Sequence, residues 1–264
     1  MSDTLSTVIL GIIEGITEFL PISSTGHLLI AERWLGQRSE LFNVAIQAGA
    51  ILALVFIYWR RLLDLLTRLE DGANRDYLAK LTVAFLITAA GGFVATRLGW
   101  KLPESVLPIA CALLIGGILI FIIEHYVAGK PKSSVVTWNV AFWVGACQIL
   151  AAVFPGTSRS ASTIFAAMLA GLTLRPAATE FAFLVGIPTM FAATGYELLK
   201  VRGQTSGEDW SALAVGFVVS LVVAFIAVKW LLRYVQSHRF TLFAWYRVVV
   251  GAALLALVAQ GSLR

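Results

Sequence analysis

The sequence predicts an all-α polytopic membrane protein, with six full transmembrane spans and two re-entrant helix–loop–helix hairpins in an inverted-topology repeat. Three observations predict this fold. Hydrophobic residues make up 59% of the 264 residues and charged residues only 13%, with a mean hydropathy of +0.85. Six apolar runs are long enough to cross a bilayer. Two further apolar stretches are interrupted by proline, glycine and hydroxyl residues.

The low share of charged residues excludes a soluble globular protein, which carries roughly a quarter charged residues to solvate its surface. It also excludes a disordered chain, a disulfide scaffold and a free-standing nucleic-acid binder. The net charge of +5 is spread over short loops, as is typical of membrane topology signals. We therefore expect one integral membrane domain over residues 1–264, with the lipid bilayer as a partner and no nucleic acid.

A helix needs about 17 to 25 apolar residues to cross the hydrocarbon core. Six runs meet this requirement, and polar or charged junctions such as residues 60–76 separate them. The predicted spans are residues 41–59, 78–96, 105–126, 177–199, 211–231 and 241–260.

The two interrupted stretches are residues 5–36, broken at Pro21, and residues 137–174, broken at Pro155. Most of the resulting legs are too short to span. The backbone groups freed at such breaks cannot face lipid, because they need hydrogen-bond partners. These stretches predict two re-entrant hairpins, and the alternative is two kinked full spans in each stretch.

The interrupted stretches also align with each other without a gap. Placing Pro21 on Pro155 pairs Glu14 with Gln148, Ser24 with Ser158 and Thr25 with Arg159. The alignment predicts one repeat over about 1–127 and a second over about 135–264, each a hairpin followed by three spans. Three spans are an odd number of crossings, so the second repeat must be inverted. Inverted repeats with broken helices place their site near the midplane of the membrane.

Glu14 and Glu18 lie just before the first break and are spaced i, i+4, so both carboxylates project from one helix face. Charges inside a membrane cost roughly 2.5–3.5 kcal/mol each at a helix centre, so they mark functional sites. Such a pair is suited to holding a divalent cation, or to acting as a base beside an acid. The alternative is a surface-lying helix whose acidic side chains contact water.

Hydroxyl residues follow the first proline, and His27 comes directly after them. Hydroxyls and free backbone N–H groups at a helix start favour an anion, and a hydroxyl near a histidine is a candidate nucleophile with its base. Ordinary N-capping is the alternative, and it is compatible with catalysis. The residues concerned are Ser23, Ser24 and Thr25.

The second break, Pro155-Gly-Thr-Ser-Arg-Ser-Ala-Ser162, combines a glycine turn, four hydroxyl side chains and Arg159 at a helix start. Arginine gives permanently charged, bidentate recognition of phosphate oxygens. The alternative is a structural ion pair of Arg159 with Glu14, Glu18 or Glu180. Together the two breaks predict a phosphoryl-transfer site for a membrane-borne phosphate ester or anhydride. Outside them, Arg247 in the last span is expected to snorkel or to pair with a neighbour.

The segments Glu14-Gly-Ile-Thr-Glu-Phe-Leu-Pro-Ile-Ser-Ser-Thr-Gly-His27 and Pro155-Gly-Thr-Ser-Arg-Ser160 closely resemble the two signatures of the bacterial undecaprenyl-diphosphate phosphatase family, also called the bacitracin-resistance protein family. The likeness continues through Gln47-Ala-Gly-Ala and Glu180-Phe-Ala-Phe, and it covers essentially the whole chain. One departure is visible: the family usually has glycine after the second Ser-Arg-Ser, where this chain has Ala161.

The resemblance implies hydrolysis of undecaprenyl diphosphate to undecaprenyl phosphate, which recycles the lipid carrier for peptidoglycan synthesis and confers bacitracin resistance. It implies a bacterial plasma (inner) membrane protein whose active site faces the periplasm or outside. A homodimer is a candidate assembly. The excess of Lys and Arg on the face that carries residues 60–76 agrees with a cytoplasmic position for that face.

The resemblance also assigns roles to residues. The catalytic set is Glu14, Glu18, Ser24, His27 and Arg159, with Mg²⁺ or Ca²⁺ expected on Glu14 and Glu18. Whether Ser24 attacks directly or His27 activates water stays open.

A transporter or flippase of polyprenyl phosphate is the alternative function. The expected substrate-binding residues are Ser23, Thr25, Gln47, Ser158, Ser160, Thr163 and Glu180.

Overall fold

The computed structural model describes residues 3–98, 105–200 and 208–261, and these residues form ten helices and no strands. Six of the helices are long and apolar enough to cross a membrane. They confirm the six predicted spans. Their bounds are α3 Glu40–Thr67, α4 Gly72–Arg97, α5 Val106–Ala128, α8 Arg175–Lys200, α9 Trp210–Ser237 and α10 Thr241–Ala259.

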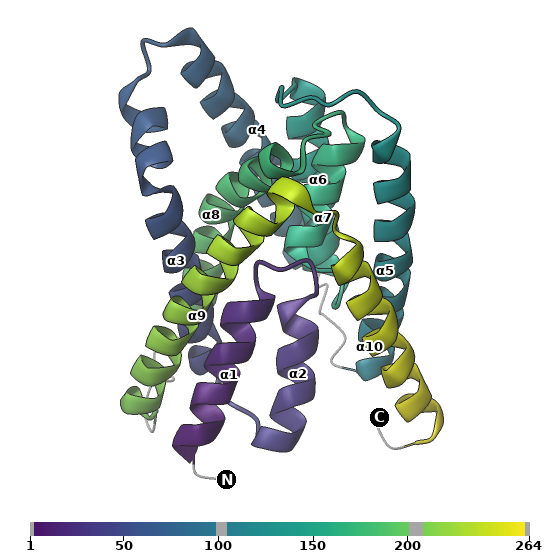
Figure 1. Ribbon diagram of the computed structural model, residues 1–264. Coiled ribbons are helices and arrows are strands. Elements are labelled where there is room, and N and C mark those ends of the chain that lie inside the picture. Colours follow the sequence, from purple (N-terminus) through teal and green to yellow (C-terminus); the bar gives the residue numbers. More distant parts are fainter. Residues whose placement is uncertain (1–2, 99–104, 201–207, 262–264) are drawn as a thin grey trace.

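The remaining four helices form the two interrupted stretches. Helix α1 (Asp3–Thr17) and α2 (Ser24–Leu35) make the first helix pair, and α6 (Trp138–Val153) and α7 (Arg159–Leu169) make the second. Figure 1 shows the pairs entering from opposite ends of the molecule, so that the turn between α1 and α2 approaches the turn between α6 and α7 near its middle. This arrangement is consistent with two re-entrant hairpins.

Three span ends differ by six or more residues from the sequence prediction, and one of them is the end of α9, which lies at Ser237 rather than at residue 231. Helix α3 continues to Thr67, beyond the predicted end at residue 59, and α4 begins at Gly72 rather than at residue 78. A helix of 28 residues is about 42 Å long at 1.5 Å per residue, which exceeds the ~30 Å hydrocarbon core. The polar segments between the two apolar runs are therefore helical, and Figure 1 shows the turn between α3 and α4 at one end of the molecule.

Glycines set the closest helix contacts, and these contacts are reciprocal between the two halves. A Cβ at Gly117 of α5 would lie 2.8 Å from the carbonyl oxygen of Ala244, and a Cβ at Gly251 of α10 would lie 3.0 Å from that of Ala110. Gly117 and Gly251 have the same spacing in the sequence as Pro21 and Pro155, and so do Ala110 and Ala244. Small residues allow membrane helices to approach closely.

The same relation holds for the outer leg of each helix pair. A Cβ at Gly11 of α1 would contact α9, 3.0 Å from the carbonyl oxygen of Gly216. Its counterpart in the alignment, Gly145 of α6, packs against α4, where a Cβ would lie 3.0 Å from the Cα of Ala84. Helix α4 is the second span of the first half and α9 is the second span of the other half. These contacts are those that an inverted repeat predicts, and the repeat boundaries stay a prediction.

Candidate active site

The turn of each helix pair contains a serine with a strained backbone conformation. Ser23 has a φ of 76° and Ser158 a φ of 69°, and they are the only residues other than glycine with positive φ in the described part of the chain. A residue other than glycine held in this region costs of order 1–3 kcal/mol, and such strain concentrates at functional sites. Ser23 directly precedes α2 and Ser158 directly precedes α7, so the strain lies where the two turns meet.

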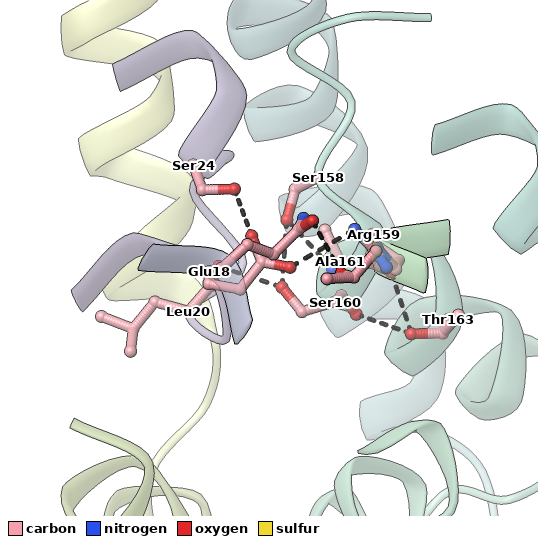
Figure 2. Close-up of polar contacts among 10 residues, drawn as sticks. Glu18, Leu20, Ser24, Ser158, Arg159, Ser160, Ala161 and Thr163 are labelled. Carbon is pink, nitrogen blue, oxygen red and sulfur yellow. Dashed lines mark hydrogen bonds and ion pairs between the residues drawn. The ribbon is translucent and has the colours of Figure 1, made fainter. Parts of the chain in front are cut away.

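Three predicted residues meet between the turns, as Figure 2 shows. The Ser24 hydroxyl, at the start of α2, donates to Oε2 of Glu18. The other carboxylate oxygen, Oε1, lies 3.4 Å from Nη2 of Arg159, at the start of α7. The Glu18 side chain is 4% exposed and that of Arg159 is 26% exposed. One buried carboxylate thus bridges a hydroxyl of the first turn and a guanidinium of the second.

The hydroxyls around Arg159 mainly hold the turns together. Ser160 Oγ donates to the carbonyl oxygen of Leu20 at 3.0 Å, which ties α7 to the first turn. Ser158 Oγ lies 3.0 Å from Ser160 Oγ and accepts from the Ala161 N–H at 3.3 Å, so it caps α7. Thr163 Oγ1 donates to the Arg159 carbonyl oxygen at 2.9 Å. The Ser23 side chain, in contrast, makes no capping bond to α2.

Two cavities flank the Glu18–Arg159 pair, and both are lined by these two residues. The first cavity is rich in hydroxyls, and its lining includes Ser23, Ser24, Thr25, Gly156 and Ser158. The second cavity is lined by both polar and apolar residues. The polar ones include Gln148, Ser160 and Thr163, and the apolar ones include Phe19, Leu54, Phe183 and Met190.

Glu14 lies one helical turn before Glu18, and the Glu18 N–H donates to its carbonyl oxygen at 3.0 Å. Its side chain is buried, and Oε2 has no hydrogen-bond partner among the described residues. Within those residues, no three His, Cys, Asp or Glu side chains form a metal-binding group. Mg²⁺ is commonly held by one or two carboxylates together with substrate phosphates and water, so two glutamates fit such a cation but not a complete protein cage.

The structure places four predicted residues outside the two cavities, namely Glu14, His27, Gln47 and Glu180. His27 Nδ1 donates to the Ser23 carbonyl oxygen at 2.6 Å, and Nε2 lies 2.7 Å from the Tyr246 hydroxyl. Gln47 Oε1 accepts from the Thr194 hydroxyl at 3.1 Å.

Glu180 forms an ion pair with Arg61 at 3.5 Å, and both side chains are more than a third exposed. The ion pair expected as the alternative for Arg159 is present in the structure, and of the three candidate partners it is made with Glu18.

Sequence reasoning missed the role of Arg247. Arg247 does not snorkel, and it has no carboxylate partner among the described residues: it is 0% exposed, and its guanidinium donates to five backbone carbonyls. Three acceptors belong to the two turns, namely Pro21 at 3.2 Å, Thr157 at 3.2 Å and Gly156 at 3.1 Å. Gly116 makes room for the guanidinium, because a Cβ there would overlap Nη2. Only the charge inside an apolar run indicated that Arg247 is important.

Gln148 was also missed as a site residue. Its side-chain Oε1 and Nε2 are buried and have no partner among the described residues. A buried polar group left unpaired costs about 1–3 kcal/mol, so such groups need an explanation. The alignment of Gln148 with Glu14 was the available signal.

The fold and the site define a polytopic membrane protein with a polar centre, suited to a phosphate group, between two broken helix pairs. The sequence matches the family described as Bacitracin resistance protein BacA over residues 7–253, and the chain belongs to this family. It is 62% identical to an undecaprenyl-diphosphatase of Rhizobium etli over 263 residues, 99% of both chains. It is 57% identical to an undecaprenyl-diphosphatase of Xanthomonas euvesicatoria over 257 residues, 97% of both chains.

Proposed function

We propose that the protein hydrolyses undecaprenyl diphosphate to undecaprenyl phosphate and inorganic phosphate, and thereby recycles the lipid carrier for peptidoglycan synthesis and confers bacitracin resistance. The observation that carries this proposal is the Ser24–Glu18–Arg159 cluster between the two turns. It joins a nucleophile, a base and a phosphate-binding cation in one buried place. The relatives named undecaprenyl-diphosphatase, which match over nearly their full length, support the substrate.

Ser24 is the nucleophile in this proposal. Its hydroxyl already donates to Glu18 Oε2, so the carboxylate is placed to take the proton as Oγ attacks the terminal phosphorus. The bond from that phosphorus to the bridging oxygen breaks, and undecaprenyl phosphate leaves. Water then hydrolyses the phosphoserine, releases inorganic phosphate and restores the hydroxyl. Arg159 lines the same cavity and stabilises the negative charge of the transferred group.

The route through water activated by His27 receives less support. His27 Nδ1 is bonded to the Ser23 carbonyl oxygen, and Nε2 faces Tyr246. His27 lines neither of the two cavities. We therefore assign it the task of holding Ser23, and with it Ser24, in place.

We propose Glu14 and Glu18 as the holders of a divalent cation, Mg²⁺ or Ca²⁺. The unpartnered Oε2 of buried Glu14 supports this assignment. Such a cation, when bound, neutralises charge on the diphosphate oxygens. The protein's own residues bind the substrate: Arg159 and the hydroxyls of Ser23, Thr25 and Ser158 surround the first cavity.

We place the protein in the bacterial inner membrane with its site open to the outside. The open end of the α1–α2 pair and the turn between α3 and α4 lie at opposite ends of the molecule (Figure 1). Arg60, Arg61, Arg68 and Arg75 gather near that turn, and positively charged loops favour the cytoplasmic side. The α1–α2 pair then enters from the outer face. A homodimer stays a prediction.

Phosphate release from undecaprenyl diphosphate by the purified protein in detergent tests the proposal. The wild type should release phosphate and Arg159→Ala should release at least a hundredfold less, because a preorganised charge at the transferred group is worth about 3–4 kcal/mol. If the folded wild type releases no more phosphate than Arg159→Ala, the phosphatase proposal fails and transport of a polyprenyl phosphate becomes the better interpretation.

A further inference from the structure

Gln148 is a buried amide without a partner in the middle of α6. Its residue is 2% exposed, and neither Oε1 nor Nε2 has a hydrogen-bond partner in the described part of the protein. An amide carries two donor hydrogens and an acceptor oxygen, and buried side-chain polar atoms are nearly always paired. An amide that no protein group satisfies is typical of a residue whose partner is a ligand.

Gln148 lines the second cavity together with Arg159 and Glu18. This cavity lies beside the Glu18–Arg159 pair, whereas Ser24 lines the first cavity. Arg159 therefore contributes to both. The apolar residues that line the second cavity include Phe19 and Phe183, whose rings pack edge to face with their centroids 5.5 Å apart.

This arrangement matches the parts of a lipid diphosphate. The terminal phosphoryl group must lie in the first cavity, within reach of Ser24 Oγ. The inner phosphate, which carries the lipid, then lies beyond Arg159 and against the second cavity. The first isoprene unit then contacts the apolar lining residues Phe19, Phe183 and Met190.

We infer that Gln148 binds the inner, lipid-linked phosphate of the substrate, with its side-chain N–H donating to a phosphate oxygen. The inference rests on the proposed function and adds a substrate-binding residue to it. The residue type agrees with this role, because an amide donates to an anion whereas a carboxylate repels it. The repeat alignment pairs Gln148 with Glu14, and a glutamate at position 148 could not bind the phosphate in this way.

The test replaces Gln148 by leucine, which has a similar volume and no polar atom. Phosphate release is measured with undecaprenyl diphosphate, and undecaprenyl phosphate and inorganic phosphate are tested as inhibitors. We expect the KM of the substrate and the inhibition constant of undecaprenyl phosphate to rise about tenfold, because both contain the inner phosphate. Inhibition by inorganic phosphate, which occupies the terminal position, should not change.

Thermal stability distinguishes a ligand from a structural residue. Gln148→Leu and Gln148→Met should unfold at the wild-type temperature or above it, since they remove an unpaired buried amide. Ser220→Ala is the matched control. Ser220 in α9 is 0% exposed, its Oγ also has no partner among the described residues, and it lines neither cavity. This variant should leave every kinetic constant unchanged.

Three outcomes would overturn the inference while the wild type is active. They are an unchanged KM and unchanged inhibition by undecaprenyl phosphate, an equal weakening of inhibition by inorganic phosphate, and a lower unfolding temperature in both Gln148 variants. A wild type that releases no phosphate would instead contradict the proposed function itself.

Discussion

Replacing Arg247 tests how the position of the two turns affects stability and catalysis, without changing the side chains that are proposed to carry out the reaction. Arg247 is fully buried in α10 and donates to carbonyls of both turns, at Pro21, Gly156 and Thr157. Methionine keeps an unbranched apolar stem at this position and removes every donor. We expect Arg247→Met to lower both the unfolding temperature and kcat, because Arg159 would no longer be held at its distance from Glu18 and Ser24.

The expected loss in the free energy of unfolding follows from the three turn carbonyls that would lose their donor. A buried group left without its partner costs about 1–3 kcal/mol, and the lower value for three groups gives roughly 3 kcal/mol. The lower value is appropriate because removing a cation that is buried without a carboxylate recovers part of its desolvation cost. For a chain of this size each kcal/mol shifts the midpoint by about 2–4 °C, so we expect a decrease of roughly 6–12 °C.

Tryptophan fluorescence in detergent follows unfolding, and phosphate release gives kcat and KM. Arg247→Lys keeps the charge with only three donors, so it should give an intermediate kcat and a nearly unchanged KM. Arg175→Lys is the matched control, because Arg175 bonds Glu124 and lines neither cavity. Arg175→Lys should lower the unfolding midpoint, but at temperatures below that midpoint it should not lower kcat. An Arg247→Met protein with wild-type stability and wild-type kcat would show that Arg247 does not hold the two turns in place.

Three further predictions concern Arg159, Gly15 and Glu124. Arg159→Lys should lower kcat/KM about tenfold to a hundredfold, since lysine keeps the charge but loses the guanidinium fork, and an unchanged kcat/KM in phosphate release would contradict this role. Gly15→Val should lower the unfolding temperature, because a Cβ would lie 2.8 Å from the Ser220 carbonyl oxygen, whereas Gly92→Ala, which meets nothing within 4 Å, should not lower it. Glu124→Gln should cost about 3 kcal/mol by removing the buried negative charge that pairs with Arg175, with KM unchanged, and a raised KM would show that the pair affects the site.

The six spans and the two breaks could be predicted from the sequence because a bilayer imposes length and composition on any helix that crosses it. The helical extension of α3 to Thr67 could not, since its last turns lie in a polar segment that hydropathy does not resolve. Residues 99–104 and 201–207 of the predicted junctions lie outside the described residues.

The site was predictable as a set of residues but not as a set of contacts. Spacing places Glu14 and Glu18 on one helix face, yet it does not show that Glu18 alone bridges Ser24 and Arg159. The contacts of Arg247 depend on carbonyls of three distant segments, which no local pattern encodes. Glu180 is a charged residue within a predicted membrane span, but its position beside Arg61 depends on the packing of α8 against α3.

Ser24, bonded to Glu18 and preceded by the strained Ser23, is the proposed nucleophile for the terminal phosphoryl group. Rapid acid quenching of the enzyme during turnover of undecaprenyl diphosphate, followed by peptide mass spectrometry, tests this role. We expect a phosphate on Ser24 in the wild type and none in Ser24→Ala, whose turnover should be nearly lost. Wild-type turnover in Ser24→Ala, with no phosphoserine trapped in either protein, would contradict attack by Ser24.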